Sequence, residues 1–307
     1  MDEDLFDCIV IGAGPAGLSA SLFLARYRHK VLTLHHNKPR NINSQGIHGF
    51  LGHHGIPPAE LLARGTEELL IHGGRIIEAG ATKIKKARAG LFKVTTEKPE
   101  SRSFLTRRVL LATGMRDVTP DCAGFREFYG SSVYHCPDCD GYEVSDKTVA
   151  VLGYGKRAVG FALELLTWTD KLTLLTDDHA ADISRASGAK LAKFNIAIRH
   201  EKVIALEGDL NTRQLQRVRF ETGSPLECDA LFFNLGTEPG SRLHETLGCK
   251  KKDDFVWVDK KQQTSVEGIY AAGDITPNSQ LAVVAAAEGA MAAIHIHESL
   301  IPPPRRV

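Results

Sequence analysis

Two cysteines separated by only two residues are the side chains of this 307-residue sequence best suited to chemistry. Cys136 and Cys139 stand in the segment CPDCDG, at residues 136–141. Two thiols at this spacing are typical of a redox couple or of half a metal site. Asp140 follows directly and is placed to exchange a proton with a leaving thiolate. An aspartate before a glycine is equally typical of a turn, so both interpretations of Asp140 stand.

The remaining cysteines argue against structural zinc. Cys8, Cys122, Cys228 and Cys249 are scattered singly, whereas a four-coordinate zinc site needs a second pair of ligands at short spacing. We expect them to behave as small buried hydrophobic side chains. Six cysteines are also too few for a disulfide scaffold in a chain of this length. The sequence therefore favours a dithiol/disulfide couple and predicts no metal site.

Histidines are numerous but do not change that prediction. The sequence has 13 of them, and 35–36, 53–54 and 295–297 contain close pairs. No Asp, Glu or Cys lies at a recognised ligand spacing from these pairs. We interpret them as surface or packing residues.

Glycine-rich turns indicate how the chain presents the cysteines. A strand-like run at 6–11 leads into a glycine turn, a helix-like run at 16–27 and a second strand-like run at 31–34. This is a βαβ unit of the expected size. A second unit has strand-like runs at 148–152 and 172–176, with a helix between them that ends near residue 168.

The first turn has the pattern of a dinucleotide site. Gly12 permits the tight turn, Gly14 lets a pyrophosphate approach the backbone, and Gly17 lets the helix pack on the strand. The bound anion would lie at the positive end of the helix dipole. Pro15 and Ala16, and the position of the turn near the N-terminus, fit a flavin-binding unit. The second strand ends in Leu-His-His-Asn, without the acidic residue expected to hold a ribose.

The second turn contains Gly153 and Gly155, with Ala158 at the third position, which the pattern tolerates. Lys156 and Arg157 are candidates to meet a pyrophosphate. The second strand of this unit runs into Asp177-Asp178 and lacks the arginines that an NADPH 2′-phosphate needs. Acidic residues there suit NADH or leave the site unused. Two such units so far apart predict two nucleotide-binding-type domains in an α/β fold, and a degenerate second domain kept as scaffold stays an alternative.

Composition excludes several classes of protein. With 43% hydrophobic residues, 24% charged residues and a net charge of +1, the sequence predicts a soluble globular protein without an affinity for nucleic acid or membranes. The apolar run at 281–294 is too short to span a bilayer. The acidic opening at 1–5 is unlike a signal or transit peptide, so we expect a cytoplasmic protein.

The order of these motifs resembles the low-molecular-weight thioredoxin reductases, within the class II pyridine nucleotide-disulfide oxidoreductases. The resemblance covers nearly the whole chain and rests on the two glycine turns, Ala112-Thr113-Gly114, CPDCDG, and Gly273-Asp274 before an Ala-rich helix. It implies two Rossmann-like three-layer domains, with a discontinuous FAD domain. The expected division is 1–118 and 248–307 for the FAD domain and 119–247 for the NAD(P)-binding-type domain with the cysteines.

The resemblance also assigns roles. Cys139 would lie nearer the flavin, Cys136 would attack the substrate disulfide, and Asp140 matches the acid/base aspartate. Asp274 would bind the flavin ribitol, and His48 would lie beside the flavin. The expected FAD-binding residues are Gly12, Gly14, Pro15, Ala16, Gly17, Asn41, His48, Thr113, Gly114, Gly273, Asp274, Gln280, Leu281 and Ala282. The expected nicotinamide-nucleotide residues are Gly153, Gly155, Lys156, Arg157, Ala158 and Asp177.

Departures from the family pattern point to one branch. The segments 39–41 and 46–51, with Gly141-Tyr142-Glu143, look like the dithiol oxidases that close disulfides in gliotoxin- and holomycin-type natural products. Those oxidases usually carry histidine where this chain has Asp140. The sequence thus combines an oxidase-like frame with a reductase-like acid/base residue.

We interpret the chain as an FAD-dependent disulfide oxidoreductase acting on a thioredoxin-like protein or on a small-molecule disulfide or dithiol. The family precedent implies a homodimer and a rotation of the cysteine-bearing domain about connections near 117–120 and 236–248. Three alternatives stand: a dithiol oxidase using O2, a reductase fed by a donor such as ferredoxin, and a flavin-containing redox sensor without turnover. NADH and NADPH both stand as donors.

Overall fold

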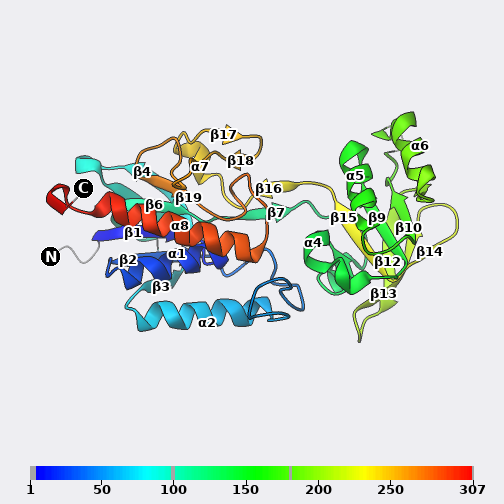
Figure 1. Ribbon diagram of the computed structural model, residues 1–307, viewed down its shortest axis with the longest axis horizontal. Helices are drawn as coiled ribbons and strands as arrows, with labels where there is room; N and C mark the ends of the chain where they lie inside the picture. The colour runs from blue at the N-terminus through cyan, green and yellow to red at the C-terminus, as the bar shows by residue number, and fades with distance from the viewer. Residues whose placement is uncertain (1–4, 98–100, 180–181, 306–307) are drawn as a thin grey trace.

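The computed structural model describes residues 5–97, 101–179 and 182–305. Most of the acidic opening, at 1–4, lies outside this part of the chain. Figure 1 shows two α/β parts, one at each end of the long axis, joined by two extended connections. The α/β architecture expected from the sequence is confirmed.

The first part is built on a seven-stranded sheet in the order β3-β2-β1-β6-β5-β4, with β19 paired to β6. Its parallel centre places Cys8 of β1 opposite Val31 of β2 and Arg108 of β6. Strand β19, far along the chain, pairs in parallel with β6, so the C-terminal segment returns to this sheet. The strands are β1 (Leu5–Ile11), β2 (Val31–His35), β3 (Arg75–Glu78), β4 (Ala81–Lys86), β5 (Phe92–Thr96), β6 (Ser103–Leu111) and β19 (Ile269–Ala271).

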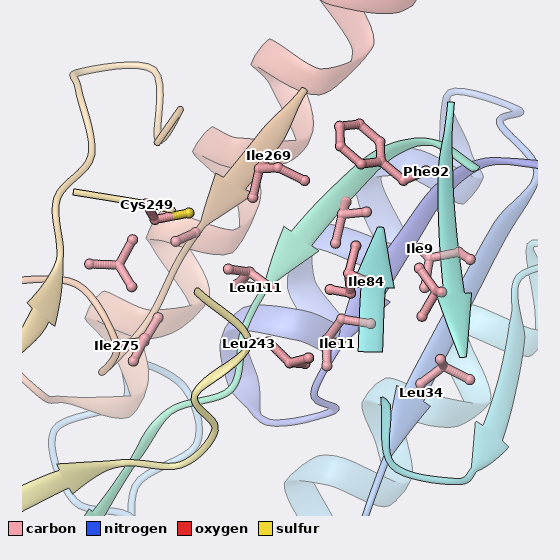
Figure 2. Close-up of a cluster of buried hydrophobic side chains, with 14 of the residues drawn as sticks. Ile9, Ile11, Leu34, Ile84, Phe92, Leu111, Leu243, Cys249, Ile269 and Ile275 are labelled. Carbon is pink, nitrogen blue, oxygen red and sulfur yellow. The ribbon is translucent and has the colours of Figure 1, made fainter. Parts of the chain in front are cut away.

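Alternation along β1 divides the core of this sheet into two layers. Ile9 and Ile11 enter the cluster shown in Figure 2, together with residues of β4, β5 and the C-terminal segment. Cys8 and Val10 point the opposite way and pack under helices α1 (Pro15–Arg26) and α8 (Ala282–Leu300). The helix α2 (Pro58–Ile71) lies beside α1. These layers hold the ends of β1, β6 and β19 together.

The second part has a five-stranded parallel sheet in the order β11-β10-β9-β15-β8. Its strands are β8 (Val133–Tyr134), β9 (Val149–Gly153), β10 (Leu172–Leu175), β11 (Ala197–Arg199) and β15 (Ala230–Asn234). Helices α5 (Gly155–Leu165) and α6 (Arg185–Lys193) pack on one face. An antiparallel sheet of β12 (Val203–Asp209), β13 (Gln214–Phe220) and β14 (Leu226–Glu227) packs with α3 (Phe125–Phe128) on the other.

The two connections form a small sheet of their own. Strand β7 (Met115–Asp117) pairs antiparallel with β16 (Thr237–Pro239), so that Asp117 faces Thr237. After β16 the chain forms α7 (Leu243–Thr246), β17 (Lys251–Lys252) and β18 (Phe255–Val256). Leu243 already belongs to the core of the first sheet. Among the described residues, no helix is long and apolar enough to cross a membrane.

Candidate active site

Each glycine of the first turn is required for a different steric reason. A Cβ on Gly12, whose φ is +113°, would lie 2.1 Å from the carbonyl oxygen of Ala112. A Cβ on Gly17 would lie 1.9 Å from the carbonyl oxygen of Gly12. Gly14 has no heavy atom within 4 Å of that position and faces open space. The turn thus packs strand, helix and β6 tightly while leaving backbone accessible at Gly14, as a pyrophosphate site requires.

A cavity of about 940 Å³ opens over this turn. That volume lies in the range of cofactor sites. Of the FAD-binding residues expected from the sequence, Gly17 does not line the cavity, because it is buried in the contact between helix and strand. The others all line it: Gly12, Gly14, Pro15, Ala16, Asn41, His48, Thr113, Gly114, Gly273, Asp274, Gln280, Leu281 and Ala282. Cys139 and Asp140 line the same cavity from the second part of the molecule. The residues present therefore fit a dinucleotide cofactor, and the same cavity extends from the glycine turn to the cysteines.

A buried carboxylate shapes the late wall of the cavity. Glu288 of α8 accepts hydrogen bonds from the Gly273 backbone N–H (2.8 Å), the Thr276 hydroxyl (2.7 Å) and the Asn278 side-chain amide (2.5 Å). It thereby fixes the loop between β19 and α8, which contains Asp274 and leads into Gln280. The sequence analysis did not single out Glu288. Its signal was a charged residue inside an Ala-rich helical run.

The cysteine pair is joined by a disulfide, with Cα atoms 5.2 Å apart. The pair flanks the start of the short helix α4 (Pro137–Asp140), with Cys136 as its N-cap. The Cys139 backbone N–H donates to the Cys136 sulfur at 3.2 Å, an arrangement that also stabilises a thiolate there. Cys139 lines the cavity, consistent with the flavin-side role that the family resemblance implies.

Asp140 is buried, with 9% of its surface exposed. Burial raises its pKa to about 7, and the negative charge of Glu143 adds to the shift. A carboxyl group with this pKa can both donate and accept a proton near neutral pH. Glu143 also lies 3.5 Å from Nδ1 of His48, which the sequence placed beside the flavin. His48 and Asp140 both line the cavity, and the charge of Glu143 acts on Asp140 while its carboxylate contacts His48.

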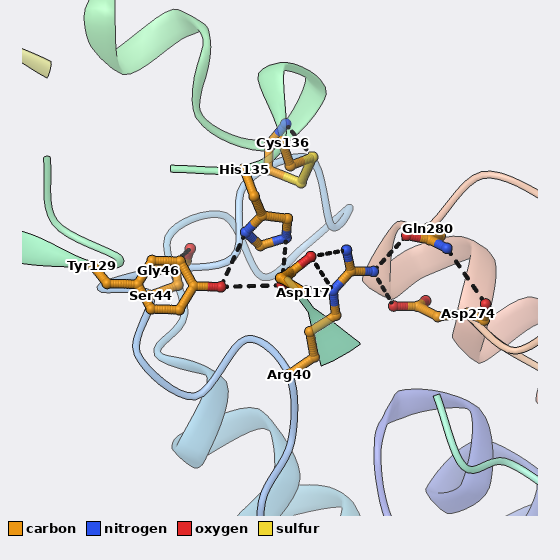
Figure 3. Close-up of a disulfide and its surroundings, with 10 residues drawn as sticks. Arg40, Ser44, Gly46, Asp117, Tyr129, His135, Cys136, Asp274 and Gln280 are labelled. Atoms are coloured by element: carbon orange, nitrogen blue, oxygen red, sulfur yellow. Dashed lines mark hydrogen bonds and ion pairs between the residues drawn. A yellow bond between two sulfur atoms is a disulfide. The ribbon is translucent and has the colours of Figure 1, made fainter. Parts of the chain in front are cut away.

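An ion-pair network that the sequence analysis missed lies next to the disulfide, as Figure 3 shows. Arg40 donates from Nε to both carboxylate oxygens of Asp117, at 3.2 and 3.0 Å. Its Nη1 donates to Asp274 (2.9 Å) and to Gln280 (2.5 Å). Although burial opposes it, the hydrogen bond from Arg40 keeps the pKa of Asp117 below its ordinary value. In the segment 39–41 the sequence predicts a cofactor contact only for Asn41 and assigns no role to Arg40.

The second glycine turn lies away from this cavity. A Cβ on Gly155, whose φ is +62°, would lie 3.8 Å from the carbonyl oxygen of Asp182, which is ordinary van der Waals contact. The Asp177 carboxylate, expected near a ribose, instead accepts from the Val203 backbone N–H at 2.7 Å and from the Tyr154 hydroxyl at 3.4 Å. The Tyr154 ring stacks on His179 with ring centres 4.0 Å apart. Lys156, Arg157 and the other residues of this turn do not line the first cavity.

The described residues contain no cluster of three or more His, Cys, Asp or Glu side chains arranged to hold a metal ion. Of the paired histidines, His295 bonds to Glu298 of its own helix, and His297 stacks on Tyr27 and bonds to His29. These contacts are those of packing and surface residues.

Comparison with known proteins agrees with the fold and the site. Residues 6–289 match the model of the pyridine nucleotide-disulphide oxidoreductase family. A thioredoxin reductase from Treponema pallidum is 31% identical over 95% of this chain and 96% of its own length. The crystal structure of HlmI superposes with a TM-score of 0.90 at 31% identity, covering 98% of this chain and 94% of HlmI.

A further structure differs in shape. The atypical thioredoxin reductase TRi from Desulfovibrio vulgaris Hildenborough is also 31% identical and covers 96% of this chain and 99% of TRi, but its TM-score is 0.52.

The chain belongs to the pyridine nucleotide-disulphide oxidoreductase family. Within it, the chain is a flavin-dependent disulfide oxidoreductase of the thioredoxin reductase type, in a branch resembling the gliotoxin- and holomycin-type enzymes. FAD is the cofactor of this class, which works with NADH or NADPH.

Proposed function

We propose that Cys136 and Cys139 pass two electrons between FAD in the 940 Å³ cavity and a disulfide of a thioredoxin-like protein or a small molecule. The observation that carries this proposal is that Cys139 and Asp140 line the same cavity as the first glycine turn. The bound flavin supplies the two-electron chemistry. The chain supplies the disulfide, the proton donor and the electrostatic surroundings.

The residue roles follow from the geometry and from thiol chemistry. Two electrons break the Cys136–Cys139 bond, and a proton from Asp140 neutralises one of the two thiolates. The Cys136 thiolate then attacks the substrate disulfide and releases one substrate thiolate. Cys139, the thiol that was neutralised, returns its proton to Asp140, attacks the mixed disulfide as a thiolate, releases the second substrate thiolate and reforms the original bond. The same steps run backwards when a substrate dithiol is oxidised.

Rotation of the cysteine-bearing domain completes the proposal. In this structure Cys139 faces the cavity, so a protein substrate needs a second pose in which the cysteines face solvent. The low TM-score of TRi at nearly complete coverage supports two arrangements of the domains within the family. We propose that the cysteine-bearing domain runs from about 119 to the end of β16 and not to 247 as the sequence predicted, because Leu243 already packs in the core of the first sheet.

We further propose a cytoplasmic homodimer. The four cysteines outside the pair are free thiols, and three of them are buried. Free thiols beside one redox-active pair fit a reducing compartment. The dimer rests on the family precedent.

Replacement of each cysteine by serine tests the reaction. Cys136→Ser and Cys139→Ser should retain FAD and lose at least about 10³-fold in disulfide reduction, because the serine hydroxyl forms no disulfide. Cys122→Ser, a half-buried cysteine outside the pair, is the matched control and should keep the parent rate. The measurement is the rate at which the enzyme, first reduced with dithionite, reduces a model protein disulfide and a small disulfide.

Other outcomes of the same assay separate the alternatives. Oxygen consumption with a small dithiol, together with no disulfide reduction, would identify a dithiol oxidase. Reduction by dithionite or ferredoxin, but by neither pyridine nucleotide, would identify a reductase with another donor. A parent enzyme that turns over with none of these substrates would replace the proposal with a redox sensor.

A further inference from the structure

We propose that Arg40 and Asp117, together with Tyr129 and His135, form a latch that holds the cysteine-bearing domain with its disulfide at the flavin cavity. The inference rests on the proposed function, because a latch has a purpose only where the domain leaves this pose. All four residues are positioning residues in this proposal. Figure 3 shows the network and its place beside Cys136.

On the flavin side the latch begins at Arg40, whose side chain is 14% exposed. It follows β2 and reaches Asp274 and Gln280, two residues of the cavity wall. The guanidinium therefore has three partners in a fixed geometry, and its fork binds the Asp117 carboxylate through two nitrogens. The three partners together fix the orientation of Arg40 at the cavity edge.

At the centre lies Asp117, whose side chain is only 6% exposed. It belongs to β7, one of the two strands that connect the parts of the molecule. A buried carboxylate is costly unless it is paired and fully hydrogen-bonded. Arg40 supplies the charge partner, and the Tyr129 hydroxyl donates a further hydrogen bond at 3.1 Å.

On the cysteine side the latch consists of Tyr129 and His135. The Tyr129 hydroxyl lies 3.3 Å from Nδ1 of His135, and Nε2 of His135 lies 3.8 Å from Asp117. The Tyr129 ring stacks on Phe125 and meets Phe233 edge-on, so it is anchored in the core of the second part. Because His135 directly precedes Cys136, the network ends at the disulfide itself.

The loop after Arg40 makes further contacts across the same boundary. The Gln45 backbone N–H donates to the Gly130 carbonyl at 3.2 Å. A Cβ on Gly130 would lie 2.1 Å from the Asn43 carbonyl oxygen, so only glycine permits this approach. His48 and Glu143 form another contact at 3.5 Å. The loop 40–48 thus contacts the surface next to the cysteines at three places besides the latch.

The energetic logic favours a reversible latch over a permanent bond. Rotation of the domain replaces the contacts of Tyr129 and His135 with Asp117 by contacts with water, while the Arg40 pair with Asp117 is retained on the flavin side. Within the latch, only the contacts that cross the boundary change, namely the Tyr129 hydrogen bond to Asp117 and the 3.8 Å approach of His135 to Asp117. Hydrogen bonds to a charged acceptor are among the stronger ones in proteins, yet their net contribution stays small enough to be reversed.

Two variants break the latch at different points. Tyr129→Phe keeps the ring in its aromatic contacts and removes only the hydroxyl that donates to Asp117. Arg40→Gln removes the charge partner of Asp117. Tyr134→Phe is the matched control, because the Tyr134 hydroxyl donates to the Ser131 carbonyl within the same domain.

The first readout uses oxidised protein without substrate or donor. Cleavage of the disulfide by a water-soluble phosphine, followed by alkylation and mass analysis, reports how often the pair faces solvent. We expect about threefold faster cleavage in Tyr129→Phe, which loses a hydrogen bond across the boundary, and a smaller increase in Arg40→Gln, which only releases Asp117 from its fixed position, with the control at the parent rate. Equal rates in parent, Tyr129→Phe and Arg40→Gln would overturn the latch.

The second readout follows electrons within one molecule. After anaerobic reduction of the bound flavin, its reoxidation by the internal disulfide should slow several-fold in both variants, while the FAD content of Tyr129→Phe stays at the parent value. If Arg40→Gln loses FAD, Tyr129→Phe decides the question alone. A parent enzyme with no internal transfer would contradict the proposed function, whereas the phosphine rates would still test the latch.

Discussion

The two glycine turns of this protein have nearly the same local sequence pattern but very different surroundings. The turn at Gly12 opens into a large cavity whose walls come from segments distant in the sequence. The turn at Gly153 lies beside Tyr154 and Asp177, whose polar groups bond to each other and to the Val203 backbone. The difference teaches that a phosphate-binding turn becomes a cofactor site only when other segments leave room and supply partners.

The strongest test of this comparison is the third position of each turn. In Gly17→Ala the new Cβ would overlap the Gly12 carbonyl oxygen, so the helix must move off the strand. We expect loss of FAD binding and a loss of stability above about 3 kcal/mol. The reverse change, Ala158→Gly, should cost only about 1 kcal/mol. FAD absorbance and thermal unfolding measure both, and a Gly17→Ala variant with full FAD content would contradict the comparison.

Replacement of Asp140 tests whether the cysteine-bearing part supplies a proton for the reaction at the first cavity. Asp140→Asn removes the proton donor and should slow disulfide reduction about 100-fold. Because the pKa of Asp140 is raised to about 7, its protonated form is present below pH 7 and lost above it. A parent rate limited by this proton falls as pH rises through 7, whereas the Asn variant shows no such step.

The control for that measurement is Asp146→Asn, an exposed aspartate a few residues along the chain. It should keep both the parent rate and the parent pH profile. Identical profiles for the parent and Asp140→Asn would exclude Asp140 as the acid.

The choice of electron donor tests whether the second glycine turn binds a nicotinamide nucleotide. By the family pattern Asp177 and Asp178 would stand near the 2′-phosphate of NADPH, so we expect NADPH to be a poor reductant, with NADH better or neither effective. Anaerobic titration of the bound flavin with NADPH, NADH and dithionite measures this. We expect NADPH to reduce the flavin at least about tenfold more slowly than dithionite does. A tenfold difference corresponds to about 1.4 kcal/mol of repulsion. Rapid stoichiometric bleaching by low micromolar NADPH would refute it.

The smallest expected effect concerns the wall of the first cavity. Glu288→Gln keeps the shape of the side chain but replaces one acceptor oxygen with an NH2 donor. That donor would face either the donors of Gly273 and Thr276 or the amide donor of Asn278, so at least one hydrogen bond is lost. We expect FAD affinity to fall about tenfold, which corresponds to about 1.4 kcal/mol. Equilibrium dialysis of apoprotein with FAD measures it, and Glu298→Gln on the exposed end of the same helix is the control. Unchanged affinity would show that the loop does not need the carboxylate.

Local sequence was enough for the elements and for much of the site. The strands and helices around both turns begin and end within three residues of their expected limits, because alternating β-branched runs and glycine punctuation act over short distances. The cysteine pair with its neighbouring aspartate was visible for the same reason. All but one of the expected flavin-site residues reach one cavity, because each lies in a loop at the edge of the same sheet or in the first turn of α1 or α8, which follow such loops.

Long-range pairings were not visible in the same way. Arg40 meets Asp117 across 77 positions and Asp274 across 234, and nothing in its own neighbourhood marks either partner. The connections expected near 117–120 and 236–248 are not free of secondary structure: the first begins at the last residue of β7, the second contains β16, and these two strands pair with each other. Likewise, the use of the Asp177 carboxylate by the Val203 backbone depends on where β12 lies.

The sequence by itself determined the redox couple, the phosphate-type turns and the α/β class, because residue type and spacing fix local chemistry and local backbone geometry. Only the tertiary structure decided that Cys139 faces the cavity, that Asp140 is buried enough for a pKa of about 7, and that Arg40 joins the flavin wall to the segment before the cysteines. Burial and ion pairing depend on which distant segments pack together, and spacing along the chain does not encode that directly.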